Sequence, residues 1–99
     1  IIVTNLSLEV IYLNEAAVQL CAQESSHVFK GQLEDLLKID WKKNESLKEI
    51  AESLNLKENW KSEQFVKTKR TASAPFEITL QAIFSESDEK MGYSFILHS

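Results

Sequence analysis

Hydrophobic and polar residues alternate most regularly in the last third of the chain. Over Phe76–Phe84, apolar side chains occupy every second position, and mostly polar side chains lie between them. A period of two is typical of a strand with one buried face, because successive side chains of a strand point to opposite sides. We therefore predict a strand in which Ile78 and Leu80 are buried while Thr79 and Gln81 face the solvent.

Three further apolar runs predict strands. They are Ile1–Val3, Val10–Leu13 and Gly92–Leu97. Each is rich in β-branched, aliphatic or aromatic residues and is bounded by polar residues that favour turns. The first two runs lie close enough together to form a hairpin across a polar turn.

Two segments have the spacing of an amphipathic helix. In Glu15–Cys21, apolar residues recur at intervals of three and four, and Asn14 stands where an N-cap residue belongs. In Leu47–Leu54 the same spacing recurs, and Ser46 with Glu49 three residues later matches a capping box. The sequence thus predicts a short helix and a longer one.

The N-terminal segment resembles the start of a PAS domain. Val3–Ala17 reads VTNLSLEVIYLNEAA. PAS domains typically begin with an aliphatic strand, a turn containing an acidic residue and a glycine, a strand that ends in asparagine, and an alanine-containing helix. Leu8 stands where the family usually has glycine, so we expect no positive φ at that residue and a hairpin that closes in another way.

Two later segments are similar to the same family. Val28–Leu37 resembles its second small helical region, and Gly31 in this segment indicates a turn or close packing. Asn59–Glu63 resembles the start of the third PAS strand, which would be Gln64–Lys69. The resemblance covers essentially the whole chain and implies one α+β, PAS-like domain over residues 1–99. This fold is a five-stranded antiparallel sheet with short helices and one longer helix packed on one face.

Composition narrows the environment and the partners. The chain has 99 residues, a net charge of −4 and one cysteine. The negative charge argues against a nucleic-acid partner, and we interpret the basic residues Lys61, Lys67, Lys69 and Arg70 as a solvated strand face. A single cysteine forms no intramolecular disulfide, which favours a cytoplasmic location. No apolar run approaches the roughly 20 residues of a membrane span, so we expect no membrane contact by this module. The chain starts without Met and stops within an apolar run, so we expect a fragment of a larger protein.

Few residues are candidates for chemistry. Cys21 occupies an apolar helix position, which favours a buried structural thiol over a nucleophile. His27 and His98 are far apart, and the sequence contains no catalytic triad order, phosphate-binding glycine loop or metal-ligand spacing. The cysteine and histidine positions that flavin-binding and haem-binding PAS domains use are not matched here. We therefore expect no catalytic residues, no cofactor and no metal.

The space between the longer helix and the sheet is either a ligand pocket or a filled core. Its many large aliphatic side chains favour a filled core, and Trp41 and Trp60 are expected to cover the core edge. The possible pocket-lining residues are Leu20, Leu36, Ile50, Leu54, Phe65, Ile78, Leu80 and Phe95.

A second surface feature concerns the sheet face that points away from the helices. Ile83 and Ile96 fall among polar residues on that face, where a one-sided sheet should be polar. If they are neighbours on adjacent strands, they form the centre of a patch that a partner could cover. Since PAS domains commonly dimerise through this face, the two residues predict a homodimer interface.

These observations favour a non-catalytic PAS-like sensory or signal-transduction module. By resemblance, it would regulate an attached output domain, such as the histidine kinase of a two-component system or a cyclic-dinucleotide enzyme. The alternative is a small-molecule-binding PAS domain with an apolar pocket between the helix and the sheet. A small α+β enzyme of unrelated fold is disfavoured because the sequence lacks a catalytic set.

Overall fold

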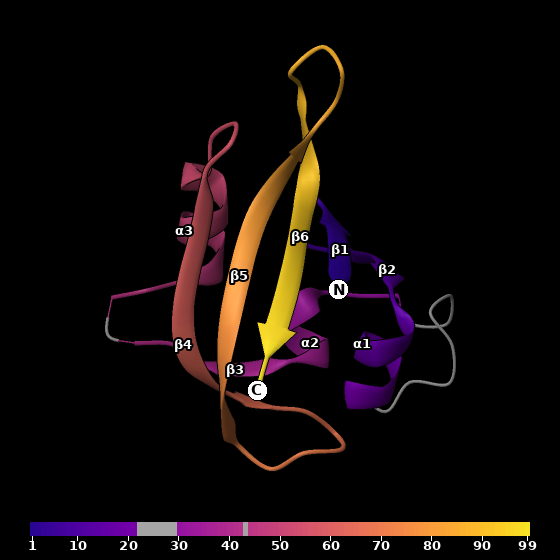
Figure 1. Ribbon diagram of the computed structural model, residues 1–99, viewed down its shortest axis with the longest axis vertical. Helices are drawn as coiled ribbons and strands as arrows, with labels where there is room; N and C mark the ends of the chain where they lie inside the picture. Colours follow the sequence, from indigo (N-terminus) through magenta and orange to yellow (C-terminus); the bar gives the residue numbers. More distant parts are fainter. Residues whose placement is uncertain (22–29, 43) are drawn as a thin grey trace.

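The computed structural model describes residues 1–21, 30–42 and 44–99. Among these residues, six strands form one antiparallel sheet in the order β2-β1-β6-β5-β4-β3 (Figure 1). The strands are β1 (Ile2–Asn5), β2 (Val10–Leu13), β3 (Lys38–Asp40), β4 (Asn59–Lys67), β5 (Ala74–Phe84) and β6 (Lys90–His98). The last strand therefore lies between the first strand and β5, in the middle of the sheet.

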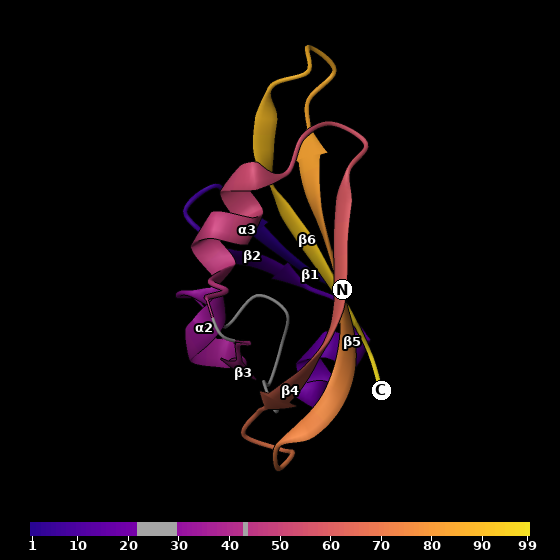
Figure 2. The ribbon, with the colours of Figure 1, turned by 90° about the vertical axis from the view of Figure 1, so that its left-hand side faces the viewer.

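The described helices are short and contribute to one face of the sheet. They are α1 (Glu15–Leu20), α2 (Leu33–Leu36) and α3 (Leu47–Ser53). Figure 2, an edge view, shows α2 and α3 on the same side of the sheet. Ala17 of α1 belongs to the same buried cluster as Leu33 of α2 and Leu47 of α3. We call the face that carries this cluster the inner face and the opposite one the outer face.

Cross-strand register aligns the inner-face residues in rows. Leu80 of β5 lies opposite Phe95 of β6 and Trp60 of β4, and Ile78 and Leu80 are fully buried. Gln81 is exposed, and Thr79 is partly buried on the outer face. The alternation predicted for β5 is therefore confirmed, and its buried positions form the centre of the core.

The predicted α+β, PAS-like fold class is wrong. The described part of the chain forms a mostly β structure with six strands instead of five, and it lacks the one longer helix. The helix predicted over Leu47–Leu54 is present as α3 over Leu47–Ser53, but at seven residues it is only one residue longer than α1. The additional strand is β3, in which Ile39 alone is apolar and pairs with Val66 of β4. A three-residue strand is too short to produce a periodic signal.

The β1–β2 turn also differs from expectation. Leu8 has a φ of 62°, in the left-handed region that we expected it to avoid. The side chain of Asn5 holds the turn, since its Oδ1 accepts from the backbone N–H groups of Ser7 at 2.9 Å and Glu9 at 3.0 Å. These bonds, together with the bond from Leu8 N–H to the Asn5 carbonyl at 3.1 Å, stabilise a backbone geometry that leucine disfavours.

Both predicted helix caps are present. The backbone N–H of Ala17 donates to Asn14 Oδ1 at 2.9 Å, which confirms Asn14 as the N-cap of α1. The N–H of Glu49 donates to Ser46 Oγ at 3.2 Å at the start of α3. Both helices therefore start at a capped residue, and their short length reflects where they end.

Candidate functional site

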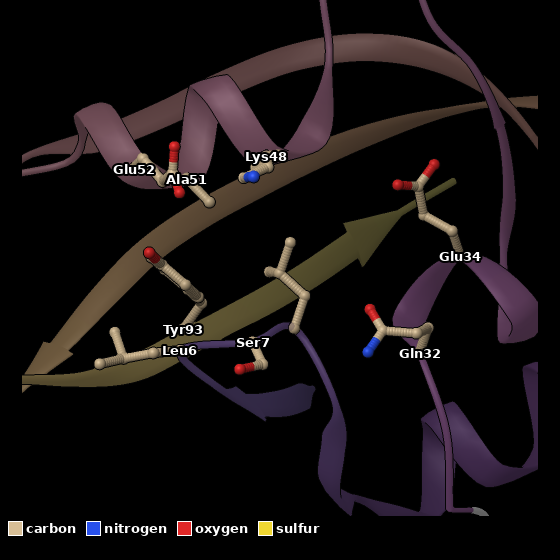
Figure 3. Close-up of a pocket in the computed structure, with 9 residues that line it drawn as sticks. Leu6, Ser7, Gln32, Glu34, Lys48, Ala51, Glu52 and Tyr93 are labelled. Carbon is tan, nitrogen blue, oxygen red and sulfur yellow. The ribbon is translucent and has the colours of Figure 1, made fainter.

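A hollow bordered by described residues opens between α3, α2, the β1–β2 turn and β6 (Figure 3). Its volume is about 470 Å³, within the size range of small-molecule sites. Its lining residues are Leu6, Ser7, Leu8, Gln32, Glu34, Lys48, Ala51, Glu52 and Tyr93. We call this space the α3–turn hollow.

Backbone hydrogen bonds hold two walls of the hollow together, the β1–β2 turn and the start of α2. The N–H of Leu33, the first residue of α2, donates to the carbonyl of Leu8 at 3.0 Å. The N–H of Val10 donates to the carbonyl of Gly31 at 2.9 Å, so the segment before α2 runs beside the start of β2. The left-handed conformation of Leu8 thus places its carbonyl against α2.

Tyr93 of β6 forms the floor of the hollow. Its side chain is only 2% exposed, and its hydroxyl group points toward Ala51 and Glu52 of α3 (Figure 3). Lys90 lies over the ring, with Nζ 5.0 Å from the ring centroid, and donates to the carbonyl of Ala51 at 2.9 Å. Lys90 therefore ties the end of α3 to the floor, in a geometry that a helix C-terminus and an aromatic face both favour.

The polar side chains that line the hollow have no bonding partner among the described residues. Within the described ranges, no hydrogen bond or ion pair involves the hydroxyl of Tyr93, and the same is true of the other polar side chains of the lining. Those groups are the side chains of Ser7, Gln32, Glu34, Lys48 and Glu52. The Tyr93 hydroxyl is not one of the buried unpartnered atoms of the described residues, which are Trp41 Nε1 and Gln64 Oε1, so it opens into the hollow, where water or a ligand can bond to it.

The α3–turn hollow also opens between α3 and the sheet, at Ala51 and Tyr93, but none of the eight residues named for the predicted pocket lines it. Most of these eight residues belong to the buried core or pack against it, and these are Leu20, Leu36, Ile50, Leu54, Ile78, Leu80 and Phe95. Phe65 is not among them: it is 54% exposed, because Gln64 and Val66 beside it on β4 point inward. Ile78, Leu80 and Phe95 line none of the three hollows described in this section.

Two of the predicted residues line smaller hollows elsewhere. Leu36 lines one of about 310 Å³ beside Lys38 and Lys67. Leu20 lines another of about 200 Å³ beside Phe76 and Leu97. Neither hollow lies between the faces that were expected to form a ligand pocket.

Sequence reasoning missed the α3–turn hollow, although Tyr93 offered a signal. The inner positions of β6 are Tyr93, Phe95 and Leu97, and Tyr93 alone brings a hydroxyl group to a face that is otherwise apolar. A buried tyrosine hydroxyl usually requires a partner. No local pattern indicated that the β1–β2 turn would lie near the start of α2 and the end of α3.

On the outer face, Ile83 and Ile96 are not neighbours. Ile96 lies opposite Thr79, whereas Ile83 lies opposite Gly92. Ile96 instead lies diagonally from Val3 of β1, which is opposite Ser94. The predicted patch centred on Ile83 and Ile96 is therefore absent from this arrangement.

Apolar residues on the outer face instead gather over β2, β1 and β6. Val3 pairs with Tyr12 of β2, which is 46% exposed, and lies diagonally from Ile96 of β6. The middle of the face over β5 and β4 is polar, with Thr79 opposite Lys61 and Glu77 opposite Glu63, whereas the exposed apolar residues Phe65 and Ile83 lie toward its two ends. We call the set Val3, Tyr12 and Ile96 the outer apolar patch.

Other candidate groups have structural explanations or lie apart from the hollow. Burial raises the pKa of the Cys21 thiol to about 11, so the thiolate is scarce at neutral pH. His98 is exposed, and His27 lies outside the described residues. Over the described ranges, no three His, Cys, Asp or Glu side chains are grouped so that they could hold a metal ion.

The tryptophans and the basic residues are placed much as their sequence positions indicated. Trp41 and Trp60 pack against the core with ring centroids 5.9 Å apart. Lys61, Lys67 and Lys69 are exposed. The guanidinium of Arg70 donates to the carbonyl of Gln19 at 3.2 Å, which connects the end of α1 to the β4–β5 turn.

Comparison with known proteins adds no assignment: no family model, no curated protein and no solved structure matches the chain. Among the described helices, none is long and apolar enough to cross a membrane.

Proposed function

We propose that this chain is a non-catalytic sensory or signal-transduction module that acts through association of two copies. The resemblance of Val3–Ala17 to the start of PAS domains supports a signalling role, and it suggests regulation of an attached output domain such as a histidine kinase. A cytoplasmic location fits the single cysteine. The buried, high-pKa thiol of Cys21 fits a structural role for the residue that is otherwise the best nucleophile candidate.

The outer apolar patch is the observation that carries this proposal. Helices α2 and α3 lie on the other side of the sheet (Figure 2), so they do not shield Val3, Tyr12 and Ile96. An apolar patch beside a polar area is typical of a protein–protein contact. A contact on a sheet face transmits a signal when it alters how two copies pack.

A second copy of the chain is the partner that suits this face best. In a twofold-symmetric contact, each patch meets an identical patch, which buries apolar surface against apolar surface. The adjoining polar area carries both charge signs, with Lys61 beside Glu63 and Glu77. A rotated copy can therefore bring the lysine of one molecule near the carboxylates of the other.

Sedimentation velocity over a range of protein concentrations tests the proposal. We expect association that strengthens with concentration, and we expect Ile96→Lys and Tyr12→Lys to weaken it, since each places a charge in the patch. Leu56→Lys is the matched control, because Leu56 is an exposed aliphatic residue (47% exposed) in the turn after α3.

Either of two results would contradict the proposal. A monomer at all concentrations, or equal weakening by Leu56→Lys, would mean that the outer apolar patch does not bind a second copy. Circular dichroism of each variant must show the same folded spectrum, since Ile96 is partly buried and its substitution could unfold the sheet.

The α3–turn hollow favours ligand binding as a second candidate function. The Tyr93 hydroxyl, which opens into the hollow from an otherwise buried side chain, and the unpartnered polar side chains around it support a small-molecule site. In this case the ligand would be the signal. Its lining differs from that of the apolar pocket that was predicted, because it is largely polar and contains none of the residues named for that pocket.

A further inference from the structure

We propose that the α3–turn hollow binds a small amphipathic molecule that carries an ammonium group. This preference rests on ligand binding, the second function proposed for the chain. The association of two copies does not depend on ligand binding or on the ammonium group. Four features of the lining define this ligand: an unused hydroxyl, an excess of negative charge, acceptor groups on facing walls, and an apolar surface.

The first feature is the hydroxyl of Tyr93. The side chain is 2% exposed and borders the hollow, and no described residue bonds to its hydroxyl group. Lys90 fixes the ring through its contact at 5.0 Å and its bond to the carbonyl of Ala51 at 2.9 Å. A ligand that enters the hollow therefore meets a hydroxyl whose position is set in advance and which can accept a hydrogen bond.

The second feature is the charge of the lining. Glu34 of α2 and Glu52 of α3 contribute carboxylates, and Lys48 contributes one ammonium group. The lining side chains thus carry one more negative than positive charge, and Lys90, over the Tyr93 ring, is a cation beside the hollow that does not line it. The chain as a whole has a net charge of −4, which also favours the approach of a cation.

The acceptors lie on facing walls. In Figure 3, Glu34 and Gln32 lie across the hollow from Glu52 and Tyr93. An ammonium group has three donors and no acceptor, so it is suited to a site where carboxylate, amide and hydroxyl oxygens converge. A carboxylate ligand would find Lys48 alone as a cationic partner, because Lys90 already bonds to the carbonyls at the end of α3.

The fourth feature is the apolar part of the lining. Leu6 and Leu8 of the β1–β2 turn and Ala51 of α3 border the same space. A ligand with a short aliphatic body can cover these side chains while its ammonium group contacts the oxygens. The preferred ligand is therefore a primary amine with a branched aliphatic chain of a few carbon atoms.

An NMR titration with three matched probes tests this preference. The probes are 3-methylbutylamine, 4-methylpentanoate and 3-methylbutan-1-ol, which share a branched aliphatic body and differ in the polar group. We expect the amine to shift the backbone amide signals of Ser7, Ala51 and Tyr93, and to bind about tenfold more tightly than the other two probes, since hydrogen bonds to charged groups are the stronger ones.

Variants test whether the named groups are responsible. Tyr93→Phe keeps the ring and removes only the hydroxyl, and Glu52→Gln removes one charge while it keeps the shape. Each should weaken amine binding about tenfold, the loss expected for one hydrogen bond to a charged group. Glu86→Gln is the matched control, because Glu86 is an exposed carboxylate in the β5–β6 turn, away from the hollow.

Each other outcome overturns a definite part of the proposal. Tighter binding of 4-methylpentanoate or 3-methylbutan-1-ol would leave the ligand-binding function intact and exclude the preference for an ammonium group. If no probe shifts the signals of the hollow, the ligand-binding candidate itself is wrong, and sedimentation still decides the association of two copies. Unchanged amine affinity in folded Tyr93→Phe would show that the hydroxyl is not part of the site.

Discussion

At the scale of single residues, Asn14 stabilises the first helix through one side-chain oxygen. Its Oδ1 accepts the N–H of Ala17 at 2.9 Å, in a helix of only six residues. We expect Asn14→Ala to lower the free energy of unfolding by about 1 kcal/mol and Asn14→Asp to lower it less, because aspartate also caps helices. Urea denaturation followed by circular dichroism measures both. Gln19→Ala on the exposed side of the same helix is the control, and an unchanged midpoint for Asn14→Ala would argue against a capping role.

The backbone of Leu8 leads to a second residue-scale prediction. Alanine is usually more stable than glycine at a given position, but the φ of 62° at Leu8 disfavours any residue with a Cβ atom. Leu8→Gly and Leu8→Ala both remove the leucine side chain, so their difference isolates the backbone. We expect the glycine variant to be more stable by about 0.5–1 kcal/mol in thermal or urea unfolding. The same pair of substitutions at Ser7 should give the usual order, and the usual order at Leu8 would mean that the turn is not strained.

At the scale of elements, β5 separates buried from exposed positions most clearly. Ile78 and Leu80 are fully buried, whereas Thr79 and Gln81 point to the outer face. We expect Ile78→Ala and Leu80→Ala each to lower the free energy of unfolding by about 2–5 kcal/mol, because each leaves a cavity in the core. Thr79→Ala and Gln81→Ala should cost much less. Similar losses at all four positions in guanidinium melts would contradict the assignment of the two faces.

Elements were predictable where their signals extend over many residues or depend on a local bond. The strand β5 has eleven residues and a clear period of two, and the caps at Asn14 and Ser46 depend on residues three positions away. By contrast, β3 has three residues, and its pairing with β4 is a tertiary contact that its own sequence does not show. The end of α3 was predicted to within one residue, since the apolar spacing continues to Leu54, whose backbone is already extended.

The candidate site was harder to predict than the elements that surround it. Tyr93, Glu34 and Glu52 come from three elements that are distant in sequence, and the chain alone does not show that they border one space. The positive φ of Leu8 was missed because the Asn5 side chain compensates for the absence of glycine, and such compensation depends on bonds made in the folded turn.

At the scale of the whole molecule, the arrangement of the strands determines the outer face. The alternation correctly predicted that Ile83 and Ile96 point to the same face of the sheet. The distance between them, however, depends on the register between β5 and β6. That register pairs Ile83 with Gly92, where a Cβ atom would overlap the carbonyl oxygen of Thr4. The glycine allows β1 to approach β6 closely, and the pairing of these strands places Val3 diagonally from Ile96.

The central place of β6 also has a consequence for how the chain folds. β1 pairs with β2 on one edge, but on its other edge Ile2 pairs with Phe95, so the first strand finds its second sheet partner only near the other end of the sequence. Closing so long a loop is slow compared with forming the adjacent hairpins β4–β5 and β5–β6. During synthesis, β1 and β2 leave the ribosome well before β6, and the unpaired edges of β1 and β5 remain open to other chains in the interval. Substitutions that delay the pairing of β1 with β6 therefore lengthen this exposure, even when they leave the stability of the folded domain unchanged.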